Sequence, residues 1–409
     1  MPPAKLAPVA TDGWRAVADT FLLGAHQMNP LVISELDTLG DMEAALRLVR
    51  DSAGAPLQLN KDSIGKRKGA MHDAARLQLL LTWARSSQNP YLHFHSANNV
   101  ETVLSELCDY APGIAALRLA EGVKVGETVV PRRVALARAA EKMQDSDAQE
   151  LSRIIKGRCI DLTCVSGSRV QYLRPLFSAR RPEAVKKSEG MHQLLRALSE
   201  QISKDDASLV PDSFLKACSI FASELFGNTQ EHAIRDHRGA FYPAHVEGLI
   251  VSWTQMDEAM FARDFHGHPR LARFWDEELA PARGGASRAL RCLQLSFFDS
   301  GPGFASRATG RATEELTRAD ERVALLSCLR KNVTTKREAG AGGGLPAVLS
   351  ELKQIGGLLR IRSGRHAVFN VFDQGEDRDL FEFSDWARDE LAPVTGAVIT
   401  LLVPLRKTP

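Results

Sequence analysis

The chain has 409 residues, which is enough for two or three domains, and its hydrophobic (44%) and charged (25%) fractions are ordinary for a globular protein. The formal net charge of +2 excludes a strong overall field towards nucleic acid or membranes. No apolar run reaches the ~18 residues that span a bilayer, and the N-terminus lacks a signal-peptide core. The six cysteines form no CxxC pair, which indicates reduced thiols rather than disulfides or zinc. We therefore expect a soluble, cytoplasmic protein.

The first half of the chain alternates helical and strand-like patterns. It predicts a helix over 71–85, a strand over 91–95, a helix over 100–119 broken at Ala111-Pro112-Gly113, and a strand over 158–165. The polar, charged stretch 180–190 is typical of a linker. We expect residues 1–190 to form an α/β or α+β domain, whose role the sequence does not indicate.

The second half has the pattern of a sheet covered by helices. It predicts a helix over 213–234, strands over 245–253 and 290–298 with a charged insertion over 257–287 between them, helices over 313–330 and 345–355, and strands over 357–362, 367–372 and 397–403. This order suits an α/β sandwich, a mixed and mostly antiparallel sheet with helices on one face, over residues 205–409.

The predicted helix over 213–234 carries a polar face. Glu224, Asn228, Glu231 and His232 stand at i, i+4, i+7 and i+8, so an α-helix brings them to one side. The Asn228 carbonyl oxygen suits magnesium on a triphosphate, and Glu224 is suited to orient a water or hydroxyl as a base. An amphipathic helix with a solvated polar face has the same spacing.

Asp299 follows an apolar run and opens the turn Asp299-Ser300-Gly301-Pro302-Gly303. A buried carboxylate at a strand end accepts a hydrogen bond from the adenine amino group, whereas the guanine carbonyl would leave it unpaired. Gly301 and Gly303 would let the backbone approach a base and ribose. An ordinary β-turn has the same composition.

The run Gly340-Ala341-Gly342-Gly343-Gly344-Leu345 leads directly into an apolar helix. Helix N-terminal amides beside flexible glycines suit the binding of a triphosphate. No Gly-Lys-Ser/Thr follows, so this is not a Walker loop, and no strand leads into it as in a Rossmann fingerprint.

Together, and in this order, the three segments resemble the N, G1 and G2 boxes of the GHKL (Bergerat-fold) ATPases, over residues 213–405. The resemblance implies that Glu224 activates the attacking water, Asn228 holds magnesium, Asp299 reads adenine and the glycine run binds phosphates. It also makes residues 304–339 the ATP lid. Lys336 or Arg337 at the end of that lid would neutralise the γ-phosphate, with Lys331 a weaker candidate.

The type of GHKL protein stays open. The Glu-Leu-x-x-Asn-x-x-Glu-His string looks closest to the anti-sigma-factor serine kinases, and glutamate at 224 disfavours histidine kinases, which usually have asparagine there. His72-Asp73 is the nearest echo of a phosphoacceptor site, and it lacks the proline. Because the last predicted strand ends near Pro409, we do not expect a gyrase-type second domain.

We therefore expect a magnesium-dependent ATPase or protein kinase with Glu224 as base, or alternatively an ATP-gated interaction module or an atypical histidine kinase. A protein partner or a homodimer is expected, and no membrane. Basic clusters at Lys66-Arg67-Lys68 and 180–187 leave nucleic acid as an alternative partner. A metal site at His266 and His268 has no evident third ligand.

Overall fold

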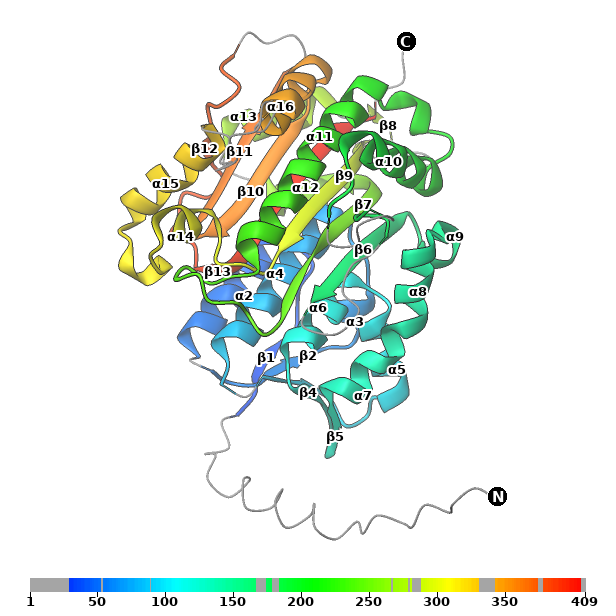
Figure 1. Ribbon diagram of the computed structural model, residues 1–409, viewed down its shortest axis with the longest axis vertical. Coiled ribbons are helices and arrows are strands. Elements are labelled where there is room, and N and C mark those ends of the chain that lie inside the picture. Colours follow the sequence, from blue (N-terminus) through cyan, green and yellow to red (C-terminus); the bar gives the residue numbers. More distant parts are fainter. Residues whose placement is uncertain are drawn as a thin grey trace, which may run out of the picture.

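The computed structural model describes residues 29–405 except 53, 89, 167–173, 179–183, 266–267, 279, 282–287, 331–342 and 374–377. Within these residues the chain is a mixed α/β protein with an N-terminal parallel α/β sheet and a C-terminal antiparallel sheet with helices (Figure 1). No helix in the described part is long and apolar enough to cross a membrane.

The first sheet is parallel except at one edge. Its strands lie in chain order: β1 (Leu31–Ile33), β2 (Leu57–Leu59), β3 (Tyr91–Phe94), β4 (Gly122–Val125) and β5 (Thr128–Pro131). The first four are parallel, and β5 returns antiparallel to β4 through a turn in which Gly126 has φ +57°. Parallel neighbours need crossover connections, so helices separate β1 to β4 along the chain.

Three of the helices of this part were predicted from its periodicity. All its helices are α2 (Leu39–Asp51), α3 (Asp62–Gly65), α4 (Ala70–Ser86), α5 (Val100–Cys108), α6 (Ala111–Leu119), α7 (Arg132–Leu136), the 3-10 turn η1 (Ala137–Ala139), α8 (Ala140–Ala148) and α9 (Leu151–Ile154), as far as the structure describes the chain. The predicted helix over 71–85 is α4, and the predicted break in 100–119 separates α5 from α6. Pro112 stands in the first turn of α6, where a missing N–H costs no hydrogen bond.

The second sheet has the order β12-β11-β10-β13-β9-β7-β6, with β8 paired to β9. Its strands are β6 (Cys159–Ser166), β7 (His245–Asp257), β8 (Ala280–Pro281), β9 (Arg288–Asp299), β10 (Leu358–Gly364), β11 (His366–Val371), β12 (Ser384–Asp385) and β13 (Val394–Pro404). Every neighbouring pair is antiparallel, so the expectation of a mixed sheet is wrong. The predicted strands over 245–253, 290–298, 357–362, 367–372 and 397–403 are confirmed.

One face of this sheet is covered by helices, including those that the sequence predicted over 213–234, 313–330 and 345–355. They are α10 (Ser188–Ile202), α11 (Asp212–Asn228) and α16 (Gly344–Ile355), with α14 (Phe304–Thr309), the 3-10 turn η4 (Thr313–Glu315) and α15 (Arg318–Arg330) at the β10 side. Phe221 and Phe226 of α11 meet Phe297 of β9 edge-on, with ring centroids 5.4 and 6.0 Å apart. These contacts anchor α11 over the middle of the sheet.

The opposite face of the sheet is covered too, so the expectation of helices on one face is wrong. Helix α4, with nearly all its side chains buried, packs on β13, β9 and β7 (Figure 1). Its first amides bond to the sheet: Ala70 N donates to Ser252 Oγ at 2.8 Å, and Met71 N donates to Gln294 Oε1 at 3.1 Å. Ser252 and Gln294 on this face therefore accept hydrogen bonds from the first amides of α4 instead of from water.

The predicted strand over 158–165 is confirmed, but it belongs to the second sheet and not to the N-terminal one. It is β6, and it pairs along its whole length with β7, from Cys159 opposite Ser252 to Ser166 opposite His245. The predicted domain over residues 1–190 would therefore place β6 in a different domain from the rest of its sheet.

The charged insertion over 257–287 packs back onto the N-terminal part. It contains α12 (Glu258–Asp264), α13 (Pro269–Glu278) and β8. At the end of α12, the Asp264 carboxylate accepts from Leu39 N at 2.6 Å and lies 2.5 Å from His72 Nε2. His72 and Asp264 are both fully buried, which makes this pair an internal tie between α4 and the insertion.

Candidate functional site

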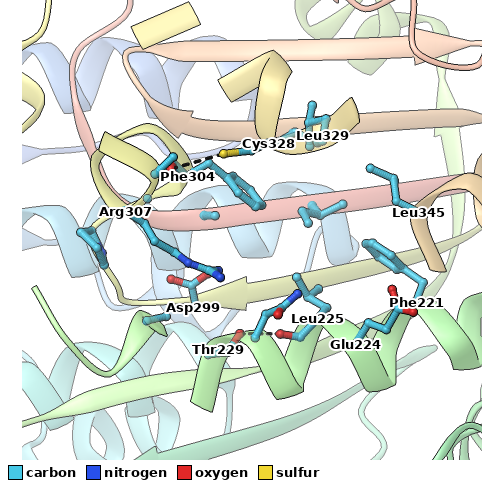
Figure 2. Close-up of a pocket in the computed structure, with 18 residues that line it drawn as sticks. Phe221, Glu224, Leu225, Thr229, Asp299, Phe304, Arg307, Cys328, Leu329 and Leu345 are labelled. Carbon is cyan, nitrogen blue, oxygen red and sulfur yellow. Dashed lines mark hydrogen bonds between the residues drawn. The ribbon is translucent and has the colours of Figure 1, made fainter. Parts of the chain in front are cut away.

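A pocket opens between α11, α14, α15 and α16, with the second sheet as its floor (Figure 2). It encloses about 930 Å³ of space not filled by atoms, part of it open to solvent. Three groups of residues line it: Phe221, Glu224, Leu225, Asn228, Thr229 and Ala233 from the α11 side; Asp299, Pro302, Gly303, Ile361, Ala397 and Ile399 from the floor; and Phe304, Arg307, Ala308, Cys328, Leu329 and Leu345 from the other helices. Parts of the three motifs predicted from the sequence thus meet in one cavity.

Helix α11 brings only two of its four predicted polar residues to this pocket. Glu224 and Asn228 line it, whereas Glu231 and His232 do not. The reason is a π-helical turn, η3 (Thr229–Ala233), which follows Asn228 and changes the rotation per residue. The expectation that all four side chains share one face is therefore wrong.

Glu224 caps the N-terminus of α16. Its carboxylate accepts from Gly343 N at 3.1 Å and from Gly344 N at 3.0 Å. These amides have no partner within their own helix, and a negative charge at a helix N-terminus is favourable. The structure thus brings Glu224, the predicted catalytic base, and two of the predicted phosphate-binding amides into direct contact.

Asp299 ends β9, as the sequence predicted, and stands on the pocket side of the sheet. Its Oδ1 accepts from Gly301 N at 2.7 Å, which closes the turn. Burial raises the pKa of Asp299, and the neighbouring Glu247 carboxylate on β7 acts in the same direction. Glu247 in turn accepts a hydrogen bond from Gln230 of the π-helical turn.

The two glycines of this turn are required by packing within the protein. A Cβ on Gly301 would lie 2.7 Å from the Cβ of Ala233 in η3. Gly303 has φ +84°, and its Cβ would lie 2.8 Å from Ser363 Oγ, which accepts from Phe304 N. The glycines therefore set the position of the turn against η3 and β10.

The glycine run is described in part. Gly343 is the N-cap of α16, Gly344 is its first residue, and Leu345 lines the pocket. A Cβ on Gly344 would lie 2.6 Å from the Phe221 Cα, so this glycine permits α16 to touch α11. The remaining predicted residues, Lys331, Lys336, Arg337, Gly340 and Gly342, lie outside the described residues.

Arg307 of α14 is a pocket residue that sequence reasoning missed. Figure 2 shows its guanidinium beside the Asp299 carboxylate. Burial lowers the pKa of Arg307, while the Asp299 charge opposes that shift. The signal available in the sequence was a lone cation four residues after Gly303, in the otherwise uncharged stretch Phe304-Ala305-Ser306-Arg307-Ala308.

His72, His192 and His268 do not line the pocket. His72 is fully buried against Asp264, and His192 Nε2 is 2.8 Å from Asp212 Oδ1. His266 lies outside the described residues, and the His268 ring stands edge-on to Phe369, 4.7 Å between centroids. Among the residues that the structure describes, no group of three His, Cys, Asp or Glu side chains is placed to hold a metal.

Comparison of the chain with protein-family models, with curated proteins and with solved structures finds no match.

Proposed function

We propose that this chain is a magnesium-dependent ATP-binding protein of the GHKL type, with ATP in the pocket between α11 and α16. The observation that carries the proposal is the pair of α16 amides, Gly343 N and Gly344 N, directed at an anionic oxygen on the pocket wall. An antiparallel sheet with α10, α11 and α16 on one face also resembles the Bergerat layout. The covered second face and the N-terminal sheet are departures from it.

The phosphate end of the pocket fits an anion. The Glu224 carboxylate already occupies the position in front of Gly343 N and Gly344 N, and it serves there as a stand-in for a phosphate oxygen. The close contact of Gly344 with Phe221 fixes the direction of these amides. A phosphate at this position would compete with Glu224 for the same two donors.

The opposite end of the pocket fits adenine. Of the two Asp299 carboxylate oxygens, Oδ1 is taken by Gly301 N, and Oδ2 makes no hydrogen bond to any described residue. That oxygen is therefore open to accept from an exocyclic amino group. Apolar side chains of Ile361, Ala397 and Ile399 form the adjacent floor, which suits the face of a flat base.

Asn228 lies between these two ends on α11. Its side chain makes no hydrogen bond within the described part of the chain, so its carbonyl oxygen is available to a magnesium ion. Bound Mg-ATP would supply an activated γ-phosphoryl group. Glu224, one helical turn away, would then orient a water or a hydroxyl and take up its proton once it leaves the α16 amides.

A nucleotide-gated module is the second candidate, and the capping contact favours it. Because Glu224 is a cap of α16 in this structure, a phosphate that displaced it would change the contact between α11 and α16. Such a change would couple ATP to the packing of α16 with little turnover.

Glu224→Gln tests both candidates. Glutamine keeps the size of the side chain but cannot act as a base, so the enzyme predicts ATP binding at least as tight as in wild type and a fall in turnover of about 10² or more. Glu200→Gln is the matched control, because Glu200 is an exposed carboxylate of α10 that pairs with Arg196 and does not line the pocket. It is expected to behave as wild type.

The readouts are ATP affinity by calorimetry with magnesium, and release or transfer of labelled phosphate. A gated module would bind ATP in the wild type without turnover. Its Glu224→Gln variant would bind ATP more tightly, because the carboxylate that competes with phosphate is gone. If neither ATP nor ADP binds in the presence of magnesium, the proposal is wrong.

A further inference from the structure

A second pocket lies on the opposite face of the sheet from the first. It is bounded by α2, the end of α12, β10 and the segment 385–391, and it holds about 1120 Å³ of space not filled by atoms, part of it open to solvent. Strand β10 separates the two cavities, since Ile361 lines the first and its neighbour Arg360 lines the second. Successive residues of a strand point to opposite faces, which places one on each side.

Arg360 is a buried cation without a hydrogen bond. Its side chain is 2% exposed, and its Nε meets no acceptor. The nearest carboxylate oxygen, Glu43 Oε1, is 4.0 Å from Nη2, beyond hydrogen-bond length. The guanidinium stands 5.0 Å from the centre of the Trp386 ring. A buried charge left this way is costly unless an anion joins it.

The carboxylates around the second pocket are already bound to other groups. Glu43 forms a two-point ion pair with Arg362, at 2.8 and 3.0 Å. The Asp264 carboxylate is held by His72 and Leu39 N, as described above. Asp385 pairs with Arg322 at 3.1 Å. None of these three therefore satisfies Arg360.

Three further arginines line the same pocket: Arg47, Arg263 and the exposed Arg388. Arg47 of α2 is half-buried and Arg263 of α12 is exposed at the opening. Within the described residues neither forms an ion pair or a side-chain hydrogen bond. The pocket thus combines three guanidinium groups that lack hydrogen-bond acceptors with three carboxylates, Glu43, Asp264 and Asp385, that already have donors.

We propose that this second pocket binds a small phosphate-bearing anion, with Arg360 as its buried anchor and Arg47 and Arg263 at the entrance. The planar guanidinium offers paired N–H donors that match two oxygens of a phosphoryl group. The volume accommodates a small organic phosphate as well as the free ion. This site is separate from the ATP pocket, and its argument does not depend on ATP binding.

The test is calorimetry on the full chain with inorganic phosphate and, in a second arm, glucose 6-phosphate, at constant ionic strength with chloride as the reference anion. Wild type is expected to bind at least one of the two. Arg360→Met, which keeps the length of the side chain without its charge, is expected to weaken binding at least about tenfold. Arg196→Met is the matched control, because Arg196 is an exposed arginine of α10 paired with Glu200.

Tighter binding of glucose 6-phosphate than of phosphate would identify an organic phosphate as the ligand, and the reverse would identify the free ion. If Arg360→Met does not fold, Arg47→Gln with Arg263→Gln carries the test and is expected to weaken binding several-fold. No binding by wild type, or equal binding by wild type and the arginine variants, would overturn the proposal. The latter outcome would assign the bound phosphate to another site, such as the α16 amides.

Discussion

Replacing Gly344 by alanine is the sharpest structural test of the first pocket. The added methyl carbon would lie 2.6 Å from the Cα of Phe221 and 2.9 Å from Glu224 Oε2. Since ordinary carbon–carbon contacts begin near 3.4 Å, α16 has to move away from α11 by roughly 0.8 Å. The clash is with backbone, so no side-chain rotation relieves it.

The expected cost follows from two opposing effects. Overpacking of this kind costs about 1–3 kcal/mol, and alanine recovers up to about 1 kcal/mol of helix propensity when it is fully inside a helix. Gly344 is only the first residue of α16, so little of that gain is realised. We expect Gly344→Ala to lower the free energy of unfolding by about 1–3 kcal/mol and to weaken ATP binding, because the amide that meets Glu224 moves.

Gly343→Ala is the matched control one residue earlier. An added Cβ there meets no atom within 4 Å, and the backbone φ of −87° suits alanine. Urea unfolding of both variants, read at constant m value, gives the comparison. If the free energies of unfolding of Gly344→Ala and Gly343→Ala agree within about 0.5 kcal/mol, the expected clash between residue 344 and the Phe221 backbone is refuted.

Three further predictions concern single carboxylates. Asp299→Asn is expected to remove about tenfold or more of any preference for ATP over GTP in a competition assay, and equal preference in both proteins would count against the adenine role. Because burial raises the pKa of Asp299 above 3.8, we also expect wild-type ATP affinity to fall on acidification at a higher pH than an exposed aspartate would give. Burial raises the pKa of Glu43, but the charge of Arg362 lowers it by more, so this pKa lies below its ordinary value of 4.5. The stability that the Glu43–Arg362 pair contributes is therefore complete above pH 4.5 and is lost as the pH falls through the folded-state pKa of Glu43. Glu43→Gln is expected to lower the free energy of unfolding by roughly 1–3 kcal/mol at pH 7 and to reduce its further fall at acidic pH, both measured by urea unfolding. If the free energies of wild type and variant fall in parallel with pH, Glu43 does not cause the acid loss. Asp264→Ala leaves His72 and the Leu39 amide without their buried partner, so the free energy of unfolding is expected to fall by about 3–5 kcal/mol in denaturant unfolding. A fall below about 1 kcal/mol would show that Asp264 does not hold α4 to the insertion.

Several of the longer elements were predicted from the sequence because their apolar periodicity is strong. β7, β9, β10, β11 and β13 were expected within a few residues, as were α4 and α16. Asp299 at the end of β9 and Glu224 and Asn228 on α11 were also correctly expected to lie on one cavity. The elements depend on local pattern, which a single sequence contains, whereas the shared cavity was expected from the resemblance to the GHKL boxes.

The errors concern features that depend on distant parts of the chain. Gln294 and Ser252 alternate with apolar residues as solvent-facing strand residues do, yet both are buried beneath α4. No local pattern distinguishes a polar side chain that bonds to water from one that bonds to a helix end. The π-helical turn at η3 was missed because helical periodicity assumes a constant rotation per residue. Arg307 was missed because its role is evident only once α14 is folded beside Asp299.

The burial of α4 between the two sheets has a consequence for how this protein can be divided. Neither sheet has a complete surface without that helix, so the two halves are expected to unfold in one cooperative transition rather than as independent modules. A fragment that began at β6 would leave the far side of the second sheet bare, with Gln294 and Ser252 uncapped. The folding unit, in the sense of the smallest piece expected to fold alone, is therefore the whole described chain.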